Sequence, residues 1–79
     1  MSNVVTVKEI LETIEKAHLV DDVNAIVLDR PLSEQGIDSL DFSGILFNLE
    51  EVFGVEIPDE DIASLQTINS ILIYINRKK

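Results

Sequence analysis

The chain has 79 residues, with no cysteine or tryptophan, and 15 acidic against 6 basic residues give it a formal net charge of −9. This length predicts a single small domain over residues 1–79. The absence of cysteine excludes disulfides, thiolate metal sites and a cysteine nucleophile, so the core must consist of packed aliphatic side chains. The charge argues against nucleic acid as a partner and favours basic proteins, because the only basic cluster is residues 77–79.

Nothing in the sequence predicts a membrane span or a secretory signal. The longest apolar run in the chain, Ile71–Ile75, is far too short to cross a bilayer. Residues 1–5 lack both a charged start and a long apolar stretch. We therefore expect a cytoplasmic protein, and a monomer.

The first predicted helix runs from about Val7 to about His18. Thr6 and Glu9 have the spacing of a capping box at its start. Apolar residues recur on one face at helical spacing, which predicts that this face is turned to a core. The predicted inward residues are Ile10, Leu11, Ile14 and Ala17.

A long connection follows, over residues 19–37. Asp22 and Asn24 can start a short turn of helix, and we expect residues 25–28 to form a loop because no second strand follows to pair with them. Long ordered loops in small domains are often functional. The apolar residues expected to reach the core from this loop are Ile26, Leu28, Leu32 and Ile37.

The central helix is predicted to run from the segment 36–40 to Phe53, with Asp38 as its N-cap and Gly54 as a left-handed C-cap. Ser39 then lies in the first turn, near the positive end of the helix dipole. The predicted core stripe is Phe42, Ile45, Leu46, Leu49, Val52 and Phe53.

The opposite face of this helix carries Leu40, Gly44, Phe47 and Glu51. Single exposed apolar residues are common and need no function. Two of them beside a serine, however, favour a docking surface next to a reactive or modified side chain.

Two more helices complete the chain. Ile57 is driven into an extended conformation by Pro58, and a short helix should run from about Asp59 to Ser64. Thr67 is placed to cap a last helix, whose inward residues are Ile68, Ile71, Leu72 and Ile75. We predict an all-α fold: a small four-helix bundle with three principal helices, one short third helix and a long loop between helices 1 and 2.

The residues do not favour catalysis or a dedicated metal site. A nucleophilic Ser39 would need a base, and the only histidine is His18, at the end of the first helix. No Gly-x-Ser-x-Gly elbow is present, and the dense carboxylates at 50–51 and 59–61 do not match a calcium loop, so we interpret them as a solvated acidic face. As the substrate of another enzyme, Ser39 needs no base, and a phosphodiester there would gain from the helix N-terminus.

Four segments resemble the acyl carrier protein family. Residues 36–41, Gly-Ile-Asp-Ser-Leu-Asp, resemble its G-x-D-S-L-D attachment motif, and residues 49–54 resemble the L-E-E-x-F-G that ends its second helix. Residues 57–60 resemble the I-P-D-E before its third helix, and residues 67–75 resemble its fourth at both ends. Their order and spacing make the resemblance specific.

The resemblance implies that Ser39 carries 4′-phosphopantetheine from coenzyme A, with Asp38 helping to engage the transferase and its Mg²⁺. The chain would not be an enzyme. It would carry acyl groups as thioesters in fatty acid, polyketide or related lipid biosynthesis, and its core could open between helices to shelter them. The implied partners are a phosphopantetheinyl transferase and acyl-transferring and acyl-modifying enzymes with basic docking surfaces. The residues implied to meet them are Leu40, Asp41, Gly44, Phe47 and Glu51.

Some positions depart from the family pattern. Ser43 and Gly44 stand where a valine and an acidic residue are usual, and Phe47 replaces a smaller apolar residue. The glycine weakens the helix but leaves a flat spot for close approach. We interpret the chain as a specialised carrier for a dedicated pathway. An aminoacyl or peptidyl carrier, and an unmodified scaffold that binds proteins through Leu40 and Phe47, remain alternatives.

Overall fold

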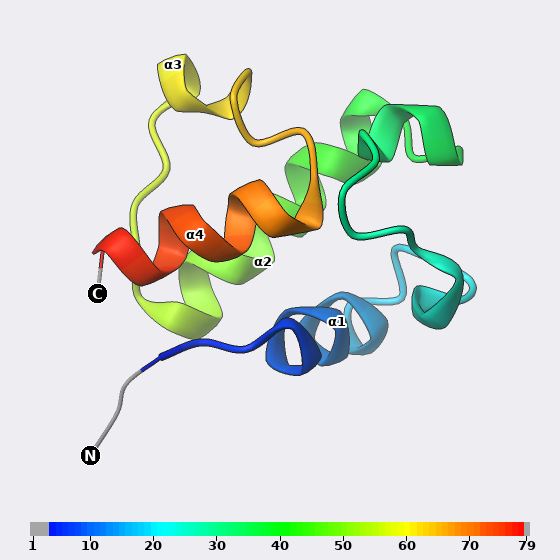
Figure 1. Cartoon of the computed structure of the whole chain (residues 1–79), viewed down its shortest axis with the longest axis horizontal. Coiled ribbons are helices and arrows are strands. Elements are labelled where there is room, and N and C mark those ends of the chain that lie inside the picture. Colours follow the sequence, from blue (N-terminus) through cyan, green and yellow to red (C-terminus); the bar gives the residue numbers. More distant parts are fainter. Residues whose placement is uncertain (1–3, 79) are drawn as a thin grey trace.

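The computed structural model describes residues 4–78, and within this range the chain is helical without any strand (Figure 1). In chain order its elements are α1 (Val7–Lys16), the 3₁₀ turns η1 (Val23–Ala25) and η2 (Leu32–Gln35), α2 (Ser39–Phe53), α3 (Asp59–Ile62) and α4 (Ile68–Lys78). The predicted four-helix fold class, with its short third helix and long first loop, is confirmed. Residues 1–3 and Lys79, which belong to the two terminal segments interpreted above, lie outside the described residues.

Local capping sets where α1 and α4 begin. The Thr6 hydroxyl accepts from the Glu9 amide (3.2 Å), and the Thr6 amide donates to the Glu9 carboxylate (3.0 Å), so the predicted capping box is confirmed. The Thr67 hydroxyl accepts from the Ser70 amide (3.0 Å) at the start of α4. These bonds satisfy amides that have no carbonyl partner within the helix.

The helix ends differ slightly from the prediction. Helix α1 stops at Lys16, not near His18, because His18 takes a left-handed conformation (φ 58°) just beyond the last turn. Helix α3 stops at Ile62, two residues before the predicted Ser64. Both helices therefore end in short turns, at residues 17–18 and 63–64.

One aliphatic core joins the three long helices. The buried residues of α1, α2 and α4 are Ile10, Ile14, Ile45, Leu46, Leu49, Ile68, Ile71 and Ile75. Val52, which the periodicity placed in the core stripe, is instead 60 % exposed. It lies about 60° around the helix from Leu49, at the edge of the stripe.

The connection between α1 and α2 also contributes to the core. Leu32 and Ile37 are buried as predicted, whereas Ile26 and Leu28 are only half-buried. The Leu32 amide donates to the Gln66 carbonyl (2.8 Å), which joins this loop to the segment before α4.

The two ends of the described chain are joined by one side chain. The carboxamide of Asn76, near the end of α4, accepts from the Val5 amide (2.7 Å) and donates to the Val5 carbonyl (3.1 Å). Val5 is buried, so this pair of bonds satisfies backbone groups that water reaches poorly. The segment before α1 thus lies beside the last turns of α4.

Candidate functional site

The first turn of α2 is fixed by Asp38. This residue has an extended backbone (φ −77°, ψ 176°), and its carboxylate accepts from the Asp41 amide (2.8 Å). Its carbonyl accepts from the Phe42 amide (2.9 Å), so the helix begins at Ser39, as the sequence predicts. The Ser39 side chain is exposed, and its hydroxyl has no hydrogen bond with the described residues.

The chain just before this turn is held in place by the core. Gly36 has a left-handed conformation (φ 84°) that a side chain would strain, and it ends η2. The next residue, Ile37, is buried, and its amide donates to the Leu32 carbonyl (3.3 Å). A buried anchor therefore lies two residues before the exposed serine, which limits how far the serine can move.

The free amides of the first turn suit a phosphodiester on Ser39. The amides of Ser39 and Leu40 occupy the first two positions of α2, where a helix offers no carbonyl partner. Oriented amides at a helix N-terminus favour a negative group. The residues present at this position therefore fit a phosphodiester-linked prosthetic group.

A hollow of about 310 Å³ opens beside Ser39, between the start of α2 and the end of α3. Its lining residues are Ser33, Ile37, Asp38, Ser39, Phe42, Ile62 and Gln66. Three of these are large apolar side chains, so the hollow is suited to an aliphatic group attached near the serine.

The predicted outer face of α2 is largely exposed. Leu40 is 80 % exposed and Phe47 59 % exposed, Glu51 is exposed, and Asp41 is half-buried. Two large apolar side chains therefore face solvent on the same helix as Ser39, with acidic side chains around them.

Gly44 is not the open flat spot expected from the sequence. It is half-buried, and a Cβ atom added there would lie 3.3 Å from Cδ1 of Leu19. The Asn48 carboxamide also donates to the Gly44 carbonyl (2.8 Å). The close approach that this glycine permits is made by Leu19, in the loop after α1.

The chain is similar to proteins of known function. The family model described as phosphopantetheine attachment site matches residues 5–75. The acyl carrier protein of Thermosynechococcus vestitus is 41 % identical over 75 residues, which are 89 % of this chain and 91 % of that protein. The acyl carrier protein of Syntrophobacter fumaroxidans is 39 % identical over 64 residues, 81 % of this chain and 64 % of that protein. The chain belongs to the acyl carrier protein family.

Membership of the acyl carrier protein family sets the general function. Acyl carrier proteins are carriers and not enzymes, and they depend on phosphopantetheine as a prosthetic group. The chain accordingly interacts with a phosphopantetheinyl transferase and with acyl-handling enzymes.

The arrangement of the carrier agrees with a non-catalytic serine. His18 is exposed beyond the end of α1, and no hydrogen bond joins it to Ser39.

Within residues 4–78, no group of three or more His, Cys, Asp or Glu side chains is arranged to hold a metal ion. None of the helices in that range has the length and apolar character needed to cross a bilayer.

Sequence reasoning missed part of the site. Ile62 and Gln66 line the hollow beside Ser39 but lie more than twenty residues further along the chain. No local pattern marks them, because their placement depends on how the segment after α2 folds back. Leu19 was missed for the same reason, although Gly44 in mid-helix is a signal that something packs closely there.

The carrier's charge predicts that its stability depends on salt. Between Pro31 and Asn76 the chain has nine acidic and no basic residues, so carboxylates there repel one another. We expect the melting temperature to rise by several degrees as salt shortens the Debye length to about 8 Å near 0.15 M, and to rise further with Mg²⁺. Thermal unfolding followed by circular dichroism measures this. A melting temperature that stays flat across the titration contradicts the prediction.

Proposed function

We propose that this carrier, acting as a monomer, holds acyl groups as thioesters on 4′-phosphopantetheine attached to Ser39. The observation that supports this most is the exposed, unbonded hydroxyl of Ser39 in the first turn of α2, beside an apolar hollow. The prosthetic group supplies a flexible arm and a thiol, which the cysteine-free chain lacks. Fatty acid, polyketide or a related lipid biosynthesis is the setting that we propose.

Asp38 has two roles in this proposal. One of its carboxylate oxygens, Oδ1, caps α2 through the Asp41 amide, while Oδ2 makes no hydrogen bond with the described residues. The second oxygen is therefore available to the transferase and its Mg²⁺ while the first keeps Ser39 at the helix start.

Partner enzymes would dock on the outer face of α2. Leu40 and Phe47 offer apolar area, and Asp41 and Glu51 offer negative charge beside it. A basic surface with an apolar centre complements this pattern, since charge guides the encounter and apolar burial holds the complex.

The hollow beside Ser39 would shelter the start of an acyl chain. Phe42 and Ile62 face it from α2 and α3, and burial of each methylene group in such a place is worth about 0.8 kcal/mol. An acyl chain that leaves water in this way would also be protected from side reactions.

Attachment at Ser39 is tested by intact mass after incubation with coenzyme A, Mg²⁺ and a broad-specificity phosphopantetheinyl transferase. The natural chain should gain one phosphopantetheine, and Ser39→Ala should gain none. Ser43→Ala is the matched control, because Ser43 is exposed on the same helix one turn further along and should not affect the reaction. A gain of mass in Ser39→Ala, or none in the natural chain, would refute the proposal.

The docking face is tested by the rate of transferase modification. Leu40→Ser and Phe47→Ser should lower kcat/KM by about tenfold or more, since each removes the burial of one large apolar side chain in the complex. Val52→Ser is the matched control, because Val52 is equally exposed (60 %) on the same helix but lies away from that face. Equal losses in all three variants would show that no particular face is used.

The departures at residues 43, 44 and 47 support a specialised carrier. The docking face lacks the acidic side chain that is usual at residue 44, where Leu19 packs against the glycine instead, and it carries the bulky Phe47, so it differs from the usual pattern both in charge and in shape. We expect the malonyl transferase and ketosynthase of general fatty acid synthesis to use the holo form with a lower kcat/KM than a housekeeping carrier. Equal rates for the two carriers would count against specialisation.

A further inference from the structure

The segment that contains α3 is firmly held only at its two ends. Before α3, Ile57 is buried and its amide donates to the Glu50 carboxylate (2.9 Å). After α3, Leu65 is buried, and the Gln66 carbonyl accepts from the Leu32 amide. Helix α3 itself has no buried residue, so the short turn between these ends depends on weaker contacts.

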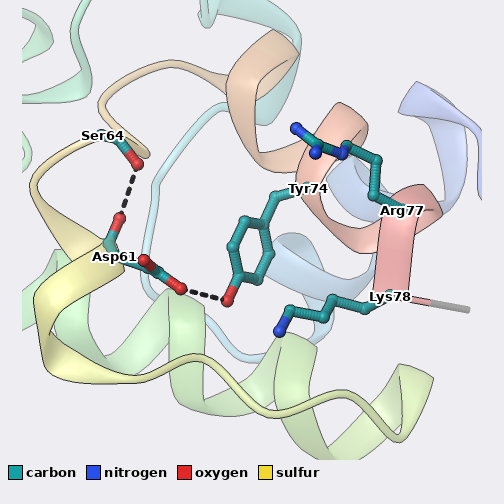
Figure 2. A pocket seen from close by; sticks show the side chains of 5 residues that line it. All are labelled: Asp61, Ser64, Tyr74, Arg77 and Lys78. Atoms are coloured by element: carbon teal, nitrogen blue, oxygen red, sulfur yellow. Dashed lines mark hydrogen bonds between the residues drawn. The ribbon is translucent and has the colours of Figure 1, made fainter.

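One side-chain hydrogen bond joins α3 to another helix. The Tyr74 hydroxyl, on α4, donates to the Asp61 carboxylate (2.7 Å), as Figure 2 shows. The other hydrogen bond drawn at Asp61 in Figure 2 is local, because the Ser64 hydroxyl donates to the Asp61 carbonyl (2.8 Å). Among the described residues, no further side-chain hydrogen bond connects α3 with α1, α2 or α4.

The surrounding charges keep Tyr74 a hydrogen-bond donor. Its bond to Asp61, together with its desolvation and the negative charges of Asp61, Glu50 and Glu56, raises the pKa of Tyr74 to about 12. The ammonium group of Lys78 lies 5.3 Å from the centre of the Tyr74 ring. The hydrogen bond thus favours the protonated phenol, which is the form that donates to Asp61, and Lys78, one turn further along α4, packs over the ring.

The position of α3 affects the hollow beside Ser39. Ile62 directly follows Asp61, is half-buried, and forms part of the hollow's lining opposite residues of α2 such as Phe42. Since α3 is one turn long, moving Asp61 also moves Ile62. The Tyr74–Asp61 bond joins α3 to α4, and the residue after Asp61, Ile62, lines the hollow beside Ser39.

We propose that Tyr74 is a positioning residue that, through its hydrogen bond to Asp61, limits the length of acyl chain that the hollow beside Ser39 accepts. The inference rests on the proposed function, because the hollow receives a chain only if Ser39 carries one. Tyr74 touches neither the serine nor the hollow, and it acts through the placement of Ile62.

Four variants separate the hydrogen bond from its surroundings. Tyr74→Phe and Asp61→Ala remove it. Asp61→Asn removes the charge but keeps an oxygen that can accept from Tyr74, and Lys78→Ala removes the cation over the ring but leaves the bond. Asp61→Asn and Lys78→Ala are therefore the matched controls for Tyr74→Phe and Asp61→Ala.

The bond itself is tested without any acyl group. Tyr74 is the only tyrosine in a chain without tryptophan, so ultraviolet absorbance should show its phenolate forming at a clearly higher pH in the natural chain than in Asp61→Ala, which lacks the bond. Amide hydrogen exchange at Ser64 and Leu65, whose amides bond within this segment, should be about twofold to tenfold faster in Tyr74→Phe and Asp61→Ala. Exchange in the two controls should match the natural chain. Phenolate formation at the same pH in the natural chain and in Asp61→Ala, or unchanged exchange in both Tyr74→Phe and Asp61→Ala, overturns the proposal.

The limit on chain length is tested with the holo protein loaded with saturated acyl groups of increasing length. The melting temperature should rise with chain length while methylene groups enter the hollow, and then level off. In Tyr74→Phe the melting temperature should level off at a longer acyl group. In Asp61→Asn it should level off at the same acyl length as in the natural protein. If Tyr74→Phe does not fold, Asp61→Ala provides the same comparison.

The possible failures are distinguishable. A plateau at the same chain length in Tyr74→Phe, despite faster exchange in α3, refutes the positioning role and leaves the carrier function intact. A melting temperature that does not depend on acyl-chain length in any variant refutes binding of the acyl chain in the hollow, and with it the proposed limit on chain length. Failure of the carrier function itself would already be visible as a missing mass gain at Ser39.

Discussion

The structure depends on one aliphatic core, which helices α1, α2 and α4 bury together. Helices α1, α2 and α4 have 10, 15 and 11 residues, lengths at which isolated helices are marginal in water. Each becomes stable only by packing its apolar stripe against the other two. Because the chain is small and lacks cysteine, and residues 4–78 form one hydrophobic core, the large aliphatic residues on the inner stripes of these helices are used in this way.

This constraint explains how an exposed serine can still be held in a fixed place. Ile37 is buried in the shared core, Asp38 caps α2, and Ser39 follows at once as the first exposed helical residue. Ser39, the attachment residue that we propose, is therefore held in place by its buried neighbour Ile37, although Ser39 itself is exposed. The same helix presents Leu40 and Phe47 to solvent, so modification and docking can use one rigid element.

Local signals predicted most of the fold and the centre of the candidate site. The caps at Thr6, Asp38 and Thr67 depend on residues three apart, and the core stripes depend on helical spacing, so both can be inferred from sequence. The misplacement of Val52 shows the limit of periodicity, because an edge position is buried only if a neighbouring element covers it.

What could not be predicted depends on segments distant in sequence. Leu19 covers Gly44 from the loop after α1, and Ile62 completes the hollow beside Ser39 from α3. The bond between Tyr74 and Asp61 likewise joins residues thirteen positions apart in two helices. Each of these contacts is set by how a connection folds back, and connections have no repeating pattern from which their path can be inferred.

The bonds between Asn76 and Val5 have a consequence for how the domain can be joined to other proteins. They hold the two ends of the described chain together, and α2 begins at the other side of the molecule (Figure 1). A linker or tag fused to either end would therefore leave from the side opposite Ser39. A neighbouring domain joined through such a linker would be tethered on that side and would leave the start of α2 accessible.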